Sequence, residues 1–259
     1  MKRLQILLTN DDGIDAEGLS SLARVLRDGA DVYVVSPELE RSAMGHAITM
    51  HKPLHADLVT AFDGAQKAWR INGTPSDCVK LGVEILMPQK PDLVLSGVNH
   101  GANLGRDIYY SGTVSAAMEG MFLGVPSIAL SYDGQDSEGL KWAAEFTQRW
   151  IHSQWFRVPP TGVLYNVNFP ALSRGVPSFM RWVRLGRHEY ANDFHKRVDP
   201  RGREYFWLAG RPQDTGEDVN TDVGALMAGN ITITPLHMDA TAYGVIPETT
   251  AITIDALFN

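Results

Sequence analysis

Short apolar runs bounded by polar or turn-forming residues alternate along the chain with stretches of helical period. This alternation is typical of βαβ units, in which parallel strands are joined by helices that cross the sheet. The pattern therefore predicts an α/β fold built on a mostly parallel sheet. The runs predicted to be strands are Leu4–Thr9, Asp31–Ser36, Trp69–Asn72, Leu93–Ser96, Ser127–Ser131 and Val163–Asn168.

Three of the intervening stretches place their apolar residues on one side of a helix, with the spacing of a buried face. A further helix is predicted after Thr74, whose hydroxyl suits an N-cap and which precedes Pro75, a residue favoured at the first helical position. The three apolar faces consist of Leu19, Leu22, Ala23 and Leu26, then Val114, Ala117, Met118, Met121 and Phe122, then Leu140, Ala143, Ala144 and Ile151.

The pattern changes after about Pro170, where charged, glycine and aromatic residues occur without a helical period. The turn signal Asp199-Pro200-Arg201-Gly202 separates Phe194–Val198 from Glu204–Leu208, which predicts a projecting β-hairpin. A last strand is predicted over Asn230–Pro235, and a tail follows it.

Composition narrows the classes of function. The chain has 259 residues and 23 basic against 30 acidic side chains, for a net charge of −7. That balance argues against binding of a nucleic-acid polymer, which needs a basic face. The single cysteine, Cys78, allows no internal disulfide and no zinc cluster, and no apolar run is long enough to span a membrane. We therefore expect a cytoplasmic protein without membrane contact.

Candidate chemistry begins at the end of the first predicted strand, because ligands of open parallel sheets bind outside the carboxyl ends of the strands. Asp11 and Asp12 follow that strand directly. Two adjacent carboxylates at a buried edge repel each other, and a bound cation stabilises them most readily. The alternative is a helix N-terminus with acidic residues in its first turn, which explains Asp15 better than the Asp11-Asp12 pair.

Two more predicted strands lead into possible ligands. The second precedes a polar loop that contains Ser42, and the fourth precedes a glycine-rich loop that contains Asn99 and Asn103. Such loops let the backbone approach a ligand closely, although an ordinary turn gives the same pattern. Asp11, Asp12, Ser42 and Asn99 would together offer only oxygen ligands, which suit Mg²⁺ or Mn²⁺ better than zinc.

The segment Ser111-Gly112-Thr113 opens the helix that contains Val114. Hydroxyls and free backbone N–H groups at a helix start bind phosphate readily, and plain N-capping is a compatible alternative. A divalent cation beside a phosphate-binding helix terminus predicts metal-assisted phosphoryl transfer or hydrolysis.

Several segments, in the same order along almost the whole chain, resemble the stationary-phase survival protein SurE family of nucleotidases. The matching segments are Leu7 to Leu19 (LLTNDDGIDAEGL), Val35 to Thr49 (VSPELERSAMGHAIT), Asn72 to Val79 (NGTPSDCV), Pro91 to Met118 (PDLVLSGVNHGANLGRDIYYSGTVSAAM) and Ile231 to Thr241 (ITITPLHMDAT).

The resemblance implies a phosphatase that removes phosphate from nucleoside 5′- and 3′-monophosphates, with some action on short polyphosphate, by attack of a metal-activated water. It places the metal ligands on Asp11, Asp12, Ser42 and Asn99, and the phosphate contacts on Asn103, Ser111, Gly112 and Thr113. One of the two carboxylates, Asp11 or Asp12, would also be a candidate to take a proton from the water.

The resemblance also implies an architecture. Residues 1–185 would form a Rossmann-like catalytic core, a mostly parallel sheet with helices on both faces. Residues 186–259 would form a smaller β-rich part with the projecting hairpin, the last core strand and an oligomerisation tail. Hairpin and tail would be exchanged between subunits of a homodimer or homotetramer, although the hairpin sequence matches the family less closely.

Two other chemistries start from the same acidic pair. One makes Asp11 the nucleophile of an aspartyl-phosphate phosphatase of the haloacid-dehalogenase type, but those enzymes carry Asp-x-Asp, whereas Asp12 and Gly13 follow here. The other is a phospho-receiver signalling domain, and the chain is about twice as long as a small domain of that kind.

Overall fold

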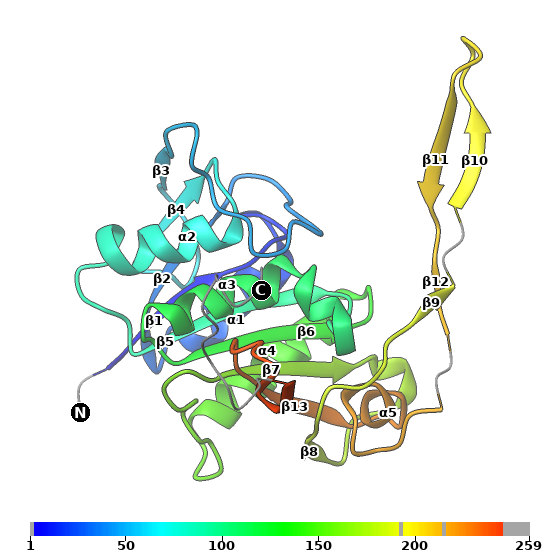
Figure 1. Ribbon diagram of the computed structural model, residues 1–259. Helices are drawn as coiled ribbons and strands as arrows, with labels where there is room; N and C mark the ends of the chain where they lie inside the picture. Colours follow the sequence, from blue (N-terminus) through cyan, green and yellow to red (C-terminus); the bar gives the residue numbers. More distant parts are fainter. Residues whose placement is uncertain (1–2, 192–193, 214–215, 246–259) are drawn as a thin grey trace, which may run out of the picture.

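The computed structural model describes residues 3–191, 194–213 and 216–245, and a nine-stranded sheet forms its centre (Figure 1). Strands β3 and β13 run antiparallel to their neighbours β4 and β7, and the other pairs in the sheet are parallel. In order across the sheet the strands are β3 (Ala56–Val59), β4 (Lys67–Ile71), β2 (Ala30–Pro37), β1 (Leu4–Thr9), β5 (Leu93–His100), β6 (Ser127–Asp133), β7 (Leu164–Pro170), β13 (Ile231–Leu236) and β8 (Met180–Trp182).

Helices cover both faces of the sheet. Successive side chains of a strand point to opposite faces, so Ile6 and Leu8 of β1 pack with α1 (Glu17–Leu26) and α4 (Ser137–Ile151). Leu7, between them, packs on the other face with α2 (Pro75–Leu81) and α3 (Gly112–Phe122). All three β1 side chains are fully buried. The predicted α/β class and the predicted mostly parallel sheet are confirmed.

Local sequence explains where several elements begin. Thr74 caps α2, accepting a hydrogen bond from the Asp77 backbone, while the Asp77 side chain accepts one from the Thr74 backbone. This reciprocal capping box confirms the predicted helix start.

The remaining helices are η1 (Gly82–Leu86), η2 (Gly105–Tyr109), η3 (Leu172–Arg174), α5 (Asp222–Met227) and η4 (Tyr243–Val245). None of the described helices is long and apolar enough to cross a membrane.

The predicted hairpin is present, with β10 (Phe194–Val198) antiparallel to β11 (Glu204–Leu208). It projects well beyond the body of the molecule, and every one of its strand residues is exposed (Figure 1). A short pair, β9 (Tyr190–Ala191) and β12 (Arg211–Pro212), forms its base. Strand β13, predicted from Asn230 to Pro235, joins the main sheet by pairing with β7. The division of the chain into two parts at residue 185 stays a prediction. The predicted tail beyond Pro247 lies outside the described residues.

Candidate active site

A cavity of about 870 Å³ lies at the carboxyl ends of β1 and β5. This is the edge where an open parallel sheet places its ligands. The structure brings together here six of the residues singled out in the sequence: Asp11, Asp12, Ser42, Asn99, Asn103 and Ser111. Gly112 and Thr113 do not line the cavity but contact Asp11 behind it.

Asp11 lies just beyond β1 and is held from behind by the start of α3. The Thr113 hydroxyl, itself fully buried, donates a hydrogen bond to Asp11 Oδ1 at 2.5 Å. Gly112 lets α3 come this close, because a Cβ added there would lie 2.7 Å from the Cβ of Asp11. Burial raises the pKa of the Asp11 carboxyl above its ordinary value, against the effect of the Thr113 hydrogen bond.

The carboxyl group of Asp12 lies close to that of Asp11, and the two negative charges repel each other. Burial, followed by the negative charge of Asp11, raises the pKa of Asp12 to about 7. Its Oδ2 is buried and has no hydrogen-bond partner among the residues that the structure describes. A carboxylate oxygen left in this state fits a site for a cation, which would supply the missing counter-charge.

Asn99 and Ser42 bring oxygen atoms to the same cavity from β5 and from the loop after β2. The β5–β6 pairing shifts register between Ser96 and Asn99, an irregularity of the kind that redirects side chains near active sites. The Asn99 amide nitrogen donates to the Gly101 carbonyl at 2.8 Å, which leaves its carbonyl oxygen for a ligand. The Ser42 hydroxyl donates to Glu40 Oε1 at 2.6 Å and keeps its lone pairs.

This donor set is compatible with a hard divalent cation. It contains two carboxylates, one amide oxygen and one hydroxyl, all oxygen ligands. Across the described residues no group of three or more His, Cys, Asp and Glu side chains is placed to hold a metal. A zinc site of the usual nitrogen and sulfur type is therefore not formed by the described residues.

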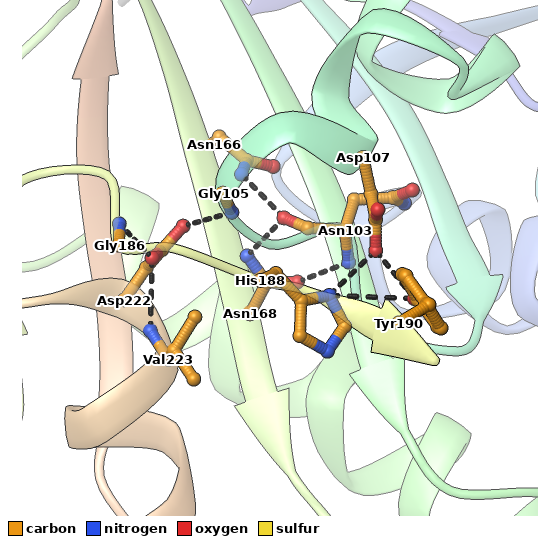
Figure 2. Close-up of polar contacts among 10 residues, drawn as sticks. All are labelled: Asn103, Gly105, Asp107, Asn166, Asn168, Gly186, His188, Tyr190, Asp222 and Val223. Carbon is orange, nitrogen blue, oxygen red and sulfur yellow. Dashed lines mark hydrogen bonds and ion pairs between the residues drawn. The ribbon is translucent and has the colours of Figure 1, made fainter. Parts of the chain in front are cut away.

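Asn103 is fixed by two asparagines of β7, Asn166 and Asn168 (Figure 2). Its backbone N–H donates to Asn168 Oδ1 at 2.8 Å, and its carbonyl oxygen accepts from the amides of both asparagines, at 2.8 and 3.1 Å. Its own amide nitrogen donates to the Ser131 hydroxyl at 2.8 Å. These bonds hold the glycine-rich loop at one position on the cavity wall.

Ser111 is the N-cap of α3, and its hydroxyl accepts a hydrogen bond from the Val114 backbone at 3.1 Å. The capping alternative is therefore realised, and Ser111 lines the cavity at the same time. The positive dipole end of the 11-residue helix packs directly against Asp11, since a Cβ at Gly112 would lie 2.7 Å from the Cβ of Asp11. The cavity thus presents carboxylates beside a terminus that favours anions.

Sequence reasoning missed part of the wall. Arg106, Asp107 and Tyr190 also line the cavity, and His188 contacts Asp107 behind it. Burial and the adjacent Asp107 carboxylate raise the pKa of the Tyr190 phenol. Asp107 lies within the Pro91 to Met118 segment that resembles the family, but Tyr190 comes from a stretch without periodicity. No local pattern in the sequence connects these two positions.

The fold and the cavity define a doubly wound α/β protein with an acidic, oxygen-lined site at the carboxyl edge of its parallel strands. The model of the family described as survival protein SurE matches residues 6–192, and the chain belongs to this family. The resemblance seen in the sequence motifs is therefore confirmed.

Individual relatives cover nearly the whole chain. The chain is 49% identical over 246 residues to a protein of Moorella thermoacetica named 5′-nucleotidase SurE, covering 95% of each chain. A protein of the same name from Gloeobacter violaceus is 50% identical over 240 residues, covering 92% of this chain and 91% of its own. The crystal structure of the SurE protein from Aquifex aeolicus superposes with a TM-score of 0.81 at 36% identity, covering 98% of this chain and all of the other.

Proposed function

We propose that the protein is a metal-dependent phosphomonoesterase that hydrolyses nucleoside 5′-monophosphates to nucleoside and phosphate. The observation that carries the proposal is the Asp11-Asp12 pair in the cavity wall, with the N-terminus of α3 packed against Asp11 and its N-cap Ser111 lining the same cavity. Relatives named 5′-nucleotidase that match over nearly the full length support the same reaction. They do not favour the aspartyl-phosphate or receiver alternatives.

We assign the cation to Asp11, Asp12, Ser42 and Asn99, and expect Mg²⁺ or Mn²⁺. Once bound there, a divalent cation would supply a lowered pKa for a water nucleophile and charge stabilisation for the phosphoryl oxygens. The unpartnered Oδ2 of Asp12 supports this assignment, because a buried carboxylate oxygen without a donor requires a counter-charge. The Thr113 hydroxyl would orient Asp11 and so acts as a positioning group.

The phosphate would lie in the cavity, beside the acidic pair and Ser111, the N-cap of α3. Ser111 and Asn103, which both line the cavity, would face it. Donors fixed before the substrate arrives stabilise the charge that develops in the transition state. The rigid anchoring of Asn103 by β7 serves this purpose.

A panel assay tests the proposal. Nucleoside 5′- and 3′-monophosphates, p-nitrophenyl phosphate (pNPP) and tripolyphosphate should be assayed for released phosphate with Mg²⁺, with Mn²⁺ and with EDTA. We expect turnover of nucleoside monophosphates only with a divalent ion, with lesser action on the 3′-esters and on short polyphosphate. Trapping with BeF₃⁻ should leave no label on Asp11. A stable aspartyl adduct would replace the water mechanism with the covalent one.

Two further properties belong to the same proposal. The fully buried Cys78 thiol and the acidic balance of the chain fit a cytoplasmic protein. The hairpin β10–β11 presents apolar side chains on an exposed arm, which fits assembly into a homodimer or homotetramer.

A further inference from the structure

The cavity continues beyond the phosphate end to a wall made by two segments far apart in the chain. Asp107 belongs to η2, and Tyr190 belongs to β9 at the base of the hairpin. Figure 2 shows Tyr190 and His188 reaching the same oxygen of Asp107. The Tyr190 hydroxyl donates to Asp107 Oδ2 at 2.7 Å, and His188 Nδ1 lies 2.6 Å from that oxygen.

One oxygen of the Asp107 carboxylate remains available to a ligand. Asp107 Oδ1 has no hydrogen bond within the described part of the chain, while the side chain keeps 19% of its surface exposed. A charged oxygen at a cavity wall is a strong acceptor for hydroxyl groups. The Tyr190 hydroxyl is committed to Asp107, and the His188 ring packs against the Tyr190 ring with 4.8 Å between centroids, so the ring is held in one orientation where it lines the cavity.

Hydrogen bonds to buried Asp222 fix both segments that form this wall. Asp222, which is fully buried, accepts hydrogen bonds from the backbone N–H of Gly105 at 2.8 Å and of Gly186 at 2.7 Å. One carboxylate therefore ties the start of η2 to the segment that leads to Tyr190 (Figure 2). A ligand that binds here meets groups already in place, which lowers the ordering cost of binding.

We propose that this wall binds the nucleoside part of the substrate, with Asp107 Oδ1 accepting hydrogen bonds from ribose hydroxyls and the Tyr190 ring stacking on the base. The inference rests on the proposed function, because it takes the phosphate to lie at the Ser111 end of the same cavity. A carboxylate favours a neutral polyhydroxyl group and repels a second phosphate. The cavity, at about 870 Å³, lies within the usual size range of small-molecule sites.

Three substrates separate the two contacts. AMP carries base and ribose, ribose 5-phosphate carries only the sugar, and pNPP carries neither. Asp107→Asn should lower kcat/KM about 10- to 100-fold for AMP and ribose 5-phosphate while leaving pNPP unchanged. Tyr190→Ala should lower kcat/KM about 10-fold for AMP alone, since base stacking is lost. Tyr190→Phe keeps the ring and should retain most of that stacking.

The outcomes are distinct. Equal losses on all three substrates would make Asp107 and Tyr190 structural and overturn the inference, as would wild-type kcat/KM for AMP in both variants. Retained pNPP turnover in each variant shows that the fold and the chemistry are intact. If the wild-type protein released no phosphate from any substrate with Mn²⁺, the proposed function itself would fail, which is a different result.

Discussion

At the scale of single residues, the acidic pair carries a stability cost when no cation is bound. Burial and mutual repulsion raise the pKa of Asp12 from 3.8 to about 7. A carboxyl group whose pKa is higher in the folded state binds protons more tightly when folded. Its contribution to stability is therefore lost as pH rises from the unfolded value through the folded one, between about pH 4 and pH 7.

This sign gives a prediction for Asp12→Asn. In chelated protein the variant should be more stable than wild type at pH 8, by on the order of 1–3 kcal/mol, because the buried charge is gone. The difference should grow from pH 4 to about pH 7 and then level off. Thermal unfolding at a series of pH values measures it. A variant that is less stable at pH 8 would mean that the pair has a structural role.

The two hydroxyls at the start of α3 should behave differently on substitution. Ser111→Ala should lower turnover roughly 10- to 100-fold at saturating metal, because a transition-state hydrogen bond is lost. Thr113→Val, which removes the hydrogen bond to Asp11, should raise the Mn²⁺ concentration needed for half-maximal rate. Thr113→Ser restores the hydroxyl and should restore the metal response. Identical effects of Ser111→Ala and Thr113→Val on metal affinity and turnover would refute separate roles.

At the scale of elements, packing decides what the sequence pattern predicts well. The buried strands and the amphipathic helices α1 and α4 were predictable because their apolar spacing reports directly on burial. Strand β3 was missed because it pairs only at the sheet edge and is mostly exposed, so no alternation marks it. Strand β5 was predicted to end at Ser96 but continues to His100, since an irregular register carries the pairing past a glycine-rich segment.

Some residues of the site were predictable from the sequence pattern and others were not. Asp11, Asp12, Ser42 and Asn99 follow strands, and strand ends converge at one edge of a parallel sheet, so their proximity in the cavity was predictable. Tyr190 reaches the cavity through β9, a two-residue strand whose position depends on buried Asp222. A contact made by long-range hydrogen bonds leaves no periodic signal in the sequence.

The close approach of α3 to β1 predicts a sensitivity at Gly112. In Gly112→Ala the new methyl group would lie 2.7 Å from the Asp11 Cβ and 2.8 Å from its Oδ2, so Asp11 or the helix must move. We expect a loss of about 1–3 kcal/mol in stability and a weaker thermal stabilisation by Mn²⁺. Gly244→Ala adds a methyl group in open space and serves as the control. An unchanged Mn²⁺ response in Gly112→Ala would contradict this packing argument.

At the scale of the whole molecule, the exposed hairpin is the feature that a single chain does not explain. Both strands of β10–β11 are exposed along their length, and a two-stranded ribbon is marginal alone in water. A partner surface would cover its large apolar side chains, which are Phe194, Val198, Tyr205, Phe206, Trp207 and Leu208.

Replacing residues 194–208 with a short Gly/Ser linker should therefore lower the oligomeric state in sedimentation experiments. Leu208 also lines the catalytic cavity, so some change in kcat/KM is expected as well. Arg201→Ala, at the exposed turn, leaves the apolar side chains in place and should keep the wild-type mass. A truncated protein with the wild-type mass and dissociation constant would assign assembly to another surface.

The most direct measurement is a Mn²⁺ titration of AMP hydrolysis after exhaustive chelation, in wild type, Asp12→Asn and Asp15→Asn. We expect no phosphate release without metal and a saturable return of activity in wild type and in Asp15→Asn, whose side chain is exposed. Asp12→Asn should stay at least roughly 10³-fold slower at every Mn²⁺ concentration, because one carboxylate of the cation site is missing. Full turnover in metal-free wild type, or wild-type rates in Asp12→Asn, would contradict a metal-dependent reaction at this acidic pair.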